Sequence, residues 1–515
     1  MKLPYLLASA AWLFSAVSLS PAAETGEGLG RIRSAIVRIR NISQRPDYGS
    51  PWLRKDFSVG RGSGVIISGN RILTSAHVVS DSRYLEVEKE DSGTPYGAVV
   101  THIAHDCDLA LVEVLDPGFF DDTSYLEFHR EIPRLGSMVE AYGFPVGGRR
   151  ITVTRGVVSR IDYALYNHSG RDYHLIAQID AAVNPGNSGG PVLKDGKIAG
   201  IVFQGVQPSE NVGHVIPITV IDHFLEDIAT GKYDGYPDLG IVAHNLLNPA
   251  YREYVGLPAD RTGVRAAALI EGHSARGLVR PGDLLLEIDG HPIRNDGTIS
   301  IGGESYFLEE VVERKQVGEE VVLGLVRDGE ELNVTVPLRR GRERLNTANE
   351  YETLPEYLVF AGLLFQPLSR EYLKTWSDDW TTRSDPRLAY YFLHYHQDRI
   401  YRRQPEVVIL SRVLPAPVNQ YYTDITQRVV DRVNGRRIRA LSDLPEAFSR
   451  PLGDYHLVEF DGEYPPLVLD RAEAAEQHPE ILERYRIPSD RHLSEPGIGL
   501  LDLFERITGL PGITR

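Results

Sequence analysis

The sequence predicts a mainly β protein with several domains. The chain has 515 residues, enough for several domains of about 100–200 residues each. From about residue 32 to residue 220 it consists of short β-rich runs separated by glycine-containing turns, as in β-barrels and β-sandwiches. Further on, GDLLLEIDGHPIRN (282–295) is similar to TQRVVDRVNGRRIRA (426–440), and each contains a turn, Asp289-Gly290 or Asn434-Gly435. A small domain is therefore expected twice.

Two hairpins and one helix can be assigned in the first region. Apolar runs flank Gly69-Asn70, and others flank Asp195-Gly196. Both dipeptides favour two-residue β-hairpin turns. Residues 220–233 carry apolar side chains at helical spacing and predict a closing helix, with Gly231 as its C-terminal cap.

Composition and charge exclude several classes of protein. Apolar residues make up 42% and charged residues 24%, which is typical of a soluble globular protein. The formal net charge of -16 would repel phosphate, so we expect no nucleic-acid partner. There is no GxxxxGK[ST] loop, so we expect no use of ATP. Cys107 is the single cysteine, so no internal disulfide can form.

The N-terminal residues 1–23 have the pattern of a secretory signal peptide. Lys2 precedes a mostly apolar run over residues 3–19, and small residues suited to cleavage follow at 20–23. The alternative is a membrane anchor, because the run is close to the shortest length that spans a bilayer. We expect cleavage and export of the mature chain. At the other end, residues 500–507 predict a short amphipathic helix.

Three segments supply the residue types of nucleophilic catalysis. Serine is a poor nucleophile at neutral pH and needs a base, usually histidine, that a carboxylate orients. LTSAHVV presents His77, DCDLALV presents Asp108 and GNSGGP presents Ser188. The segment around Ser188 also fits G-x-S-x-G, but α/β-hydrolases have the order Ser, acid, His and a helix after the serine. The order His, Asp, Ser is that of the chymotrypsin-type double β-barrel.

Several motifs resemble the HtrA/Deg family of serine proteases. GSGVII, LTSAHVV, DLALV and NPGNSGGPV occur in the family's order, and YGSPWLRK, GFPVGG and VTRGVVSRI are most similar to plant Deg proteases and their bacterial relatives. The resemblance implies a trypsin-like protease domain over 24–235 and a PDZ domain over 236–341. It further implies a PDZ-like domain over 342–515 with an aromatic-rich insertion and a C-terminal helical tail. Homotrimers or larger assemblies and a periplasmic location are also implied.

The resemblance assigns roles to individual residues. Ser188 is the expected nucleophile, His77 the base and Asp108 the orienting acid, and the N–H groups of Gly186 and Ser188 are the expected oxyanion hole. Asp106 is a competing acid, but the family places the acid directly before Leu-Ala-Leu, which selects Asp108. An uncharged Ala182 at the pocket floor implies cleavage after small or medium aliphatic residues. The expected wall is formed by Ile201, Val202 and Phe203.

The two repeated units are expected to resemble PDZ domains, which bind an extended peptide as an added strand. In the first unit the carboxylate-binding loop is expected at Leu239, Gly240 and Ile241, facing a helix near 306–315 that presents Leu308 and Val312. In the second unit the corresponding segments are 359–365 and 441–448. This copy departs from the family pattern, so it binds either a peptide or an internal segment.

The sequence therefore predicts an ATP-independent serine endopeptidase that degrades misfolded or exposed chains and captures peptide C-termini through PDZ domains. No cofactor is expected. His394, His396 and Asp398 could suggest a metal site, but the aromatic residues around them favour packing, so no metal is expected either. The alternative function is a chaperone or peptide-binding scaffold with a dormant triad.

Overall fold

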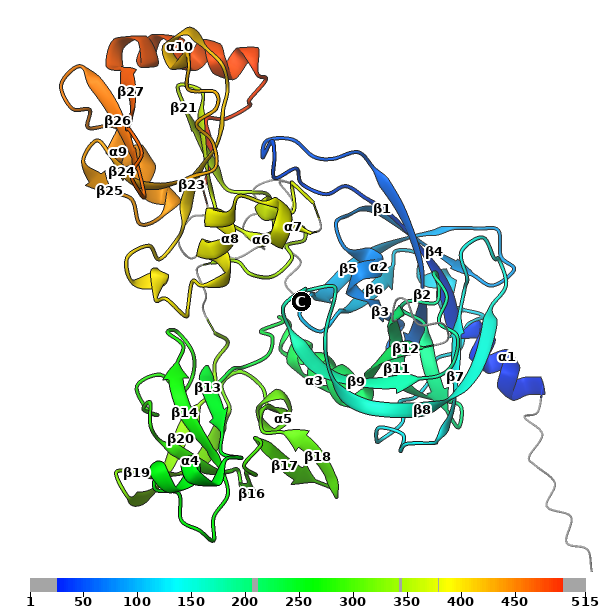
Figure 1. Ribbon diagram of the computed structural model, residues 1–515. Coiled ribbons are helices and arrows are strands. Elements are labelled where there is room, and N and C mark those ends of the chain that lie inside the picture. The colour runs from blue at the N-terminus through cyan, green and yellow to red at the C-terminus, as the bar shows by residue number, and fades with distance from the viewer. Residues whose placement is uncertain (1–25, 206–211, 342–344, 378, 494–515) are drawn as a thin grey trace, which may run out of the picture.

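The computed structural model describes residues 26–205, 212–341, 345–377 and 379–493 (Figure 1). The expected signal peptide at 1–23 and the expected helix at 500–507 lie outside these ranges. None of the described helices is both long enough and apolar enough to cross a bilayer.

Strands from residues 36–205 and 213–217 form two closed β-barrels (Figure 1). The first has the strand order β1-β2-β3-β6-β5-β4, from β1 (Ile36–Ser43), β2 (Ser58–Ile67), β3 (Arg71–Ser75), β4 (Ser82–Lys89), β5 (Tyr96–Ala104) and β6 (Leu109–Val114). The second has the order β10-β11-β12-β9-β8-β7, from β7 (Met138–Gly143), β8 (Thr152–Leu165), β9 (Tyr173–Ile179), β10 (Pro191–Lys194), β11 (Lys197–Gly205) and β12 (Gly213–Pro217). The double barrel expected from the sequence is present.

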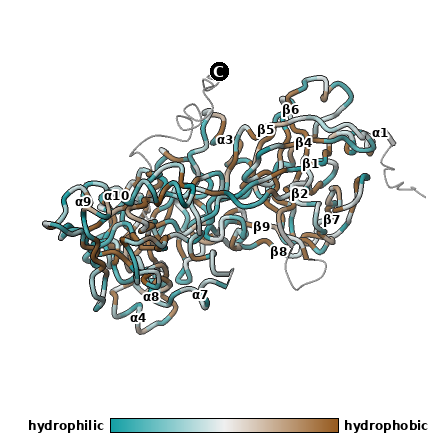
Figure 2. The backbone as a smooth tube through the Cα atoms, turned by 90° about the horizontal axis from the view of Figure 1, so that it is seen from above, coloured by the Kyte–Doolittle hydropathy of each residue, from teal (hydrophilic) through white to brown (hydrophobic). Residues whose placement is uncertain are grey.

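Local turn chemistry explains where these strands reverse. Asn70 (φ 56°) and Gly196 (φ 72°) adopt left-handed backbone conformations in the β2–β3 and β10–β11 hairpins. The closing helix α3 (Ile218–Asp227) continues into a short 3₁₀ turn and ends at Gly231, whose φ is 90°. Apolar segments lie within the barrels and the C-terminal domain, whereas many connecting loops are hydrophilic (Figure 2).

The middle domain is an antiparallel sheet with the order β13-β14-β15-β19-β20. Its strands are β13 (Ile241–Asn245), β14 (Val264–Leu269), β15 (Leu284–Ile288), β19 (Glu320–Arg327) and β20 (Glu330–Pro337), and β16 (His291–Pro292) pairs with β15.

The expected helix over 306–315 is shorter than predicted. Tyr306 belongs to a hairpin of β17 (Thr298–Ile301) and β18 (Glu304–Phe307), so helix α5 spans only Glu309–Glu313. Tyr251 of helix α4 (Pro249–Tyr254) packs against a small apolar cluster that includes Leu284 of β15 and Val326 of β19.

The C-terminal domain repeats this topology and adds two strands. Strands β22 (Leu363–Pro367), β23 (Val408–Val413), β24 (Arg428–Val433), β26 (Tyr455–Phe460) and β27 (Leu467–Asp470) lie in the same order as the strands of the middle domain, and β25 (Arg436–Arg437) pairs with β24. The additional strands β21 (Tyr357–Phe360) and β28 (Arg491–His492) lie beyond β22. The predicted repeat is therefore present. Helix α9 (Leu444–Phe448) corresponds to α5, and α10 (Arg471–Arg484) closes the domain.

The aromatic-rich insertion is a helical cluster with its own apolar core. It contains α6 (Arg370–Leu373), α7 (Trp380–Arg383) and α8 (Pro386–Leu393). Buried Trp380, Tyr391, Phe392 and Tyr395 pack there. Within the described ranges, no three histidine, cysteine or acidic side chains are grouped as metal ligands.

Candidate active site

The candidate site lies where the two barrels meet. His77 is in α2 (Ala76–Val79), directly after β3, and Asp108 directly precedes β6. Strands β3 and β6 pair with Ser75 opposite Leu109, and the Ala76 N–H donates to the Asp108 carbonyl oxygen at 3.0 Å. The strand register thus brings His77 to Asp108. Ser188 comes from the loop between β9 and β10 of the other barrel.

Two hydrogen bonds fix His77 against Asp108. The His77 backbone N–H donates to Asp108 Oδ1 at 2.8 Å, and His77 Nδ1 lies 2.7 Å from Asp108 Oδ2. The Asp108 side chain is 1% exposed, whereas that of His77 is 33% exposed. A proton on Nδ1 therefore faces the buried carboxylate and leaves Nε2 as the basic atom.

Electrostatics favour an ionised Asp108. Burial opposes ionisation, but the charge of His77 and the hydrogen bonds from His77 outweigh it and lower the pKa of Asp108. Burial also favours neutral His77, yet the Asp108 charge and hydrogen bond raise the pKa of that imidazole.

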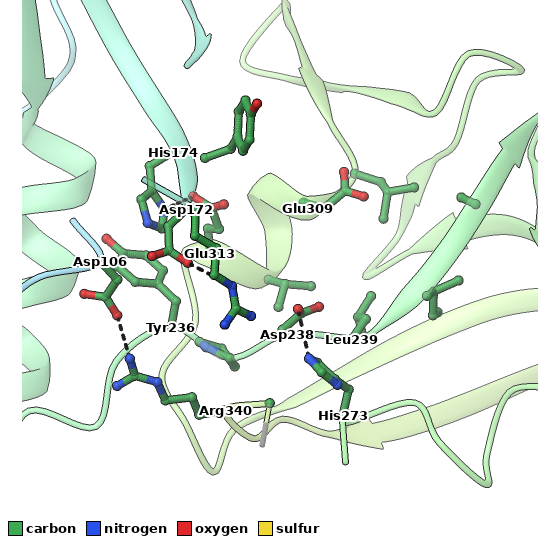
Figure 3. A pocket seen from close by; sticks show the side chains of 18 of the residues that line it. Asp106, Asp172, His174, Tyr236, Asp238, Leu239, His273, Glu309, Glu313 and Arg340 are labelled. Atoms are coloured by element: carbon green, nitrogen blue, oxygen red, sulfur yellow. Dashed lines mark hydrogen bonds and ion pairs between the residues drawn. The ribbon is translucent and has the colours of Figure 1, made fainter. Parts of the chain in front are cut away.

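The competing carboxylate, Asp106, has different partners. Tyr233 donates its hydroxyl to Asp106 Oδ1 at 2.6 Å, and the Arg340 guanidinium lies 3.3 Å from Oδ2 (Figure 3). Burial acts against the charged form, but Arg340 and Tyr233 lower the pKa of Asp106. Asp106 therefore joins the first barrel to the chain that leaves the middle domain. Cys107 between the two aspartates is buried, and burial raises the pKa of its thiol.

Backbone shape in the Ser188 loop requires glycine at two positions. Gly186 has φ 101°, and a Cβ there would lie 2.3 Å from the Phe144 carbonyl oxygen. Gly189 has φ 81°, and its Cβ would lie 2.2 Å from Thr74 Oγ1. In the described part of the chain, no acceptor takes the N–H of Gly186 or of Ser188. Both amides are thus available to a ligand oxygen.

Ser63 is a positioning residue that the sequence analysis missed. Its hydroxyl donates to the Gly186 carbonyl at 2.8 Å and accepts from the Phe144 N–H at 2.8 Å, while its own N–H donates to the Ser188 carbonyl at 2.8 Å. Ser63 is completely buried. It therefore ties the Ser188 loop to the first barrel. It is the second residue of GSGVII, which indicated family resemblance but not this contact.

Asn187 precedes Ser188 and is also buried. Its Oδ1 lies 3.5 Å from Thr152 Oγ1, and its Nδ2 has no partner among the described residues. A neutral amide needs no counter-ion at such a position, whereas an aspartate would.

A second missed feature lies behind His77. His168, in the loop between β8 and β9, is buried with its ring 6.2 Å from that of His77. Its Nε2 lies 2.9 Å from His105 Nδ1, and Tyr351 stacks on it at 4.1 Å. Burial, together with the charges of His105 and His77, lowers the pKa of His168 to about 3, although Asp108 opposes this. His168 is therefore neutral at physiological pH.

The chain before the C-terminal domain reaches this loop through residues 349–352, which we call the docking segment. Tyr351 Oη and Asn349 Nδ2 each donate to the His168 carbonyl at 2.8 Å. Glu352 Oε2 lies 2.7 Å from His105 Nε2. Glu352 Oε1 accepts from the Asp81 N–H at 2.6 Å, and the Glu352 N–H donates to Asp81 Oδ1 at 2.8 Å.

The expected specificity residues lie along β11 and the Ser188 loop. Ile201, Val202 and Phe203 are fully buried, with Val202 in the core of the second barrel. Ala182 is half-buried, and its carbonyl accepts from Thr154 Oγ1 at 3.1 Å.

The expected peptide groove of the middle domain contains a pocket of about 360 Å³ (Figure 3). Leu239, Ile241, Leu308 and Val312 line it, and Gly240 lies on its loop with φ 67°. The second unit differs: β21 pairs with the edge of β22 that corresponds to the edge of β13 left unpaired among the described strands, and Phe360 of β21 stacks on Phe448 of α9 at 4.0 Å. An internal strand therefore fills the corresponding groove.

Comparisons with known proteins find matching domain families and similar proteases. Residues 62–201 match the trypsin-like peptidase domain family, and residues 347–494 match the PDZ domain family. "Protease Do-like 2, chloroplastic" of Arabidopsis thaliana is 34% identical over 476 residues, covering 91% of this chain and 77% of the relative. "Protease Do-like 4, mitochondrial" of the same organism is 33% identical over 458 residues, covering 88% and 84%. A solved structure, "HtrA-type protease AlgW with decapeptide", has 23% identity and a TM-score of 0.47, covering 61% of this chain and 98% of that one.

Fold and site together define a trypsin-like serine endopeptidase followed by PDZ-like domains. Since it spans most of relatives more than 30% identical to it, the chain belongs to the Do-like, or HtrA/Deg, family of serine proteases. This membership supports protease function over a scaffold with a dormant triad.

Proposed function

We propose that His77, Asp108 and Ser188 are the catalytic triad of this protease. Ser188 Oγ attacks the peptide carbonyl, His77 Nε2 takes its proton and passes it to the leaving amine, and Asp108 holds the Nδ1 proton. The 2.7 Å contact between His77 Nδ1 and the buried Asp108 is the observation that carries the proposal.

The oxyanion of the tetrahedral intermediate is assigned to the N–H groups of Gly186 and Ser188. Their freedom from other acceptors in the described chain supports this role. Removing one such donor in comparable enzymes costs about 2.7–4 kcal/mol of transition-state stabilisation.

Degradation of an unfolded protein tests the activity. Casein should be degraded by the wild type without ATP, and Ser188→Ala should lower the rate by more than about a thousandfold. Equal rates in the two proteins would exclude the proposed nucleophile. The variant removes one oxygen atom and keeps the loop backbone, so it also serves to separate binding from cleavage.

We further propose an apolar primary pocket with Ala182 at its floor and β11, including Ile201, Val202 and Phe203, as its wall. Small or medium aliphatic residues would then precede the cut. Profiling with a random peptide library tests this, and cleavage after arginine or lysine would contradict it.

The middle domain is proposed to be a PDZ domain over 236–341 that captures extended peptides of misfolded or exposed chains, with 24–235 as the protease domain and 342–515 as the second PDZ-like domain. Leu239, Gly240, Ile241, Leu308 and Val312 would bind the peptide. Quality-control proteolysis is the function that this combination supports.

Assembly and location complete the proposal. We expect a homotrimer or larger homo-oligomer, which light scattering coupled to size-exclusion chromatography measures. Export to the periplasm after removal of residues 1–23 is tested by N-terminal sequencing of the mature protein. The names of the two Arabidopsis relatives instead refer to the mitochondrion and chloroplast.

A further inference from the structure

The groove of the middle domain combines an open sheet edge with an apolar floor. Among the described strands, β13 pairs only with β14, so its other edge is available to an added strand. Helix α5 lies across the groove, and Leu285, Leu308 and Val312 line the floor. The inference below rests on the proposed peptide-binding function of this groove and concerns the charge of the peptide that it selects.

The loop that would bind the terminal carboxylate of a peptide already binds a side-chain carboxylate of its own, that of Asp238. The Gly240 N–H donates to Asp238 Oδ1 at 2.7 Å. Asp238 Oδ2 lies 3.5 Å from His273 Nε2, and the Asp238 side chain is 56% exposed (Figure 3). A peptide carboxylate entering this loop would have to displace the Asp238 carboxylate and would meet its charge.

Carboxylates outnumber basic side chains around the pocket, with five (Asp106, Asp172, Asp238, Glu309 and Glu313) against four. Each basic side chain has a carboxylate partner: Arg340 with Asp106 at 3.3 Å, His174 with Glu313 at 3.1 Å, Arg171 with Asp172 at 4.0 Å and His273 with Asp238 at 3.5 Å.

Glu309, on α5, is the pocket carboxylate that is not part of such a pair. It lines the pocket and forms no ion pair with any residue that the structure describes. Glu309 is exposed, but the pocket around it removes part of its water and raises the pKa of its carboxyl, and the negative charges of Glu313 and Asp238 raise that pKa further. The field at this position is therefore one that attracts a cation.

We propose that the groove beside β13 selects extended peptides that present a lysine or arginine side chain to Asp238 and Glu309, and that it does not select a free terminal carboxylate. The apolar floor holds a neighbouring aliphatic side chain, and the β13 edge supplies backbone hydrogen bonds. Specificity then arises from attraction of the cation and from repulsion of peptides that bring an anion to the same place.

Fluorescence anisotropy on the full chain carrying Ser188→Ala tests the proposal without cleavage. The probes are labelled aliphatic peptides of equal length with either arginine or glutamate beside the anchoring residue, each with a free or an amidated C-terminus. The arginine peptides should bind at least about tenfold more tightly than the glutamate peptides, since the exchange turns an attraction into a repulsion. Amidation should leave the affinity of the arginine peptide unchanged or improve it.

Two variants in the Ser188→Ala background assign the effect to the groove. Glu309→Gln should reduce the preference for arginine to less than about threefold. Glu253→Gln removes an exposed carboxylate from α4 of the same domain and should leave the preference unchanged.

The outcomes separate this inference from the function on which it rests. Tight binding of the glutamate free-acid peptide, or an arginine preference that survives Glu309→Gln, would overturn the inference and leave peptide capture standing. Absence of binding by every probe would overturn both the inference and peptide capture by the middle domain. Proteolysis itself is judged separately by the casein assay.

Discussion

At the scale of single residues, opposing effects set the titration of His77. Burial lowers its pKa, but the charge and hydrogen bond of Asp108 are together stronger, so the pKa lies above its ordinary value of about 6.5. The base must be neutral to accept the Ser188 proton, so protonation on the acid side removes activity. We expect kcat/KM to fall with decreasing pH with a midpoint above about 6.5.

The two neighbouring aspartates provide a matched control for this pH profile. Asp108→Asn should lower kcat by about ten-thousandfold, because it disturbs the tautomer of His77. Asp106→Asn removes a carboxylate two residues away that does not touch His77, and it should keep the acid limb of the profile. A wild-type midpoint well below pH 6 would contradict the conclusion that Asp108 raises the pKa of His77.

Asn187 offers a second test at this scale. In Asn187→Asp the buried position would hold a carboxylate with no cation beside it, so about 3–5 kcal/mol of stability should be lost at pH 7. Burial raises the folded-state pKa of such a carboxylate above its unfolded value, so the penalty should disappear as the pH falls below about 4. Urea unfolding at both pH values measures this. A penalty independent of pH would point to steric disruption instead.

At the scale of elements, the docking segment is the contact that links the C-terminal domain to the loop behind His77. Asn349 and Tyr351 donate hydrogen bonds to the His168 carbonyl of that loop, and Glu352 fixes the segment to Asp81 and His105 of the first barrel. The sequence could not reveal this, because Glu352 and Asp81 are 271 positions apart and neither belongs to a recognisable motif.

Weakening the contacts of the docking segment should loosen the loop around His168 without unfolding the protein. Glu352→Gln keeps an acceptor for Asp81 but removes the charge beside His105. We expect faster hydrogen exchange over residues 167–170 and a kcat reduced by about three- to tenfold with KM nearly unchanged. Glu480→Gln, which alters an exposed residue of α10, should change neither quantity. Unaltered exchange in Glu352→Gln would show that the contact does not hold the loop.

Elements whose structure is decided locally were predictable. The Asp289-Gly290 and Asn434-Gly435 turns have left-handed backbone conformations in both repeats, and α3 ends at Gly231 as expected. The contact between His77 and Asp108 also follows from two motifs on paired strands. In contrast, the helix expected over 306–315 was too long, because pairing between β17 and β18 outweighs the helical pattern around Tyr306. The contacts of Ser63 bridge both barrels and left no local signal.

At the scale of the whole molecule, α5 and the chain after it attach the middle domain to the barrels. Tyr163 donates its hydroxyl to Glu310, His174 Nδ1 lies 3.1 Å from Glu313, and Arg340 reaches Asp106. The groove that we propose to bind peptide therefore shares its helix with the protease interface.

The His174 contact makes this attachment depend on pH. Burial lowers the pKa of His174, but the charge and hydrogen bond of Glu313, with Asp172 and Asp106, raise it to about 9. Because the folded-state value lies above the unfolded one, the stabilisation is complete below about pH 6.5 and is lost as the pH rises through about 9. Thermal unfolding of the wild type and His174→Gln should differ most at pH 6 and converge above pH 9. A constant difference would contradict the ion pair.

The strand that fills the second groove has a consequence for competition. Only Ala361 and Gly362 separate β21 from β22, so the strand is tethered beside the edge that it occupies. A tether this short corresponds to an effective concentration in the millimolar range or above. Free segments of unfolded chains at micromolar concentration therefore compete with it at a large disadvantage. The two repeats therefore differ: among the described strands the outer edge of β13 is unpaired, whereas that of β22 is occupied by β21 of the same chain.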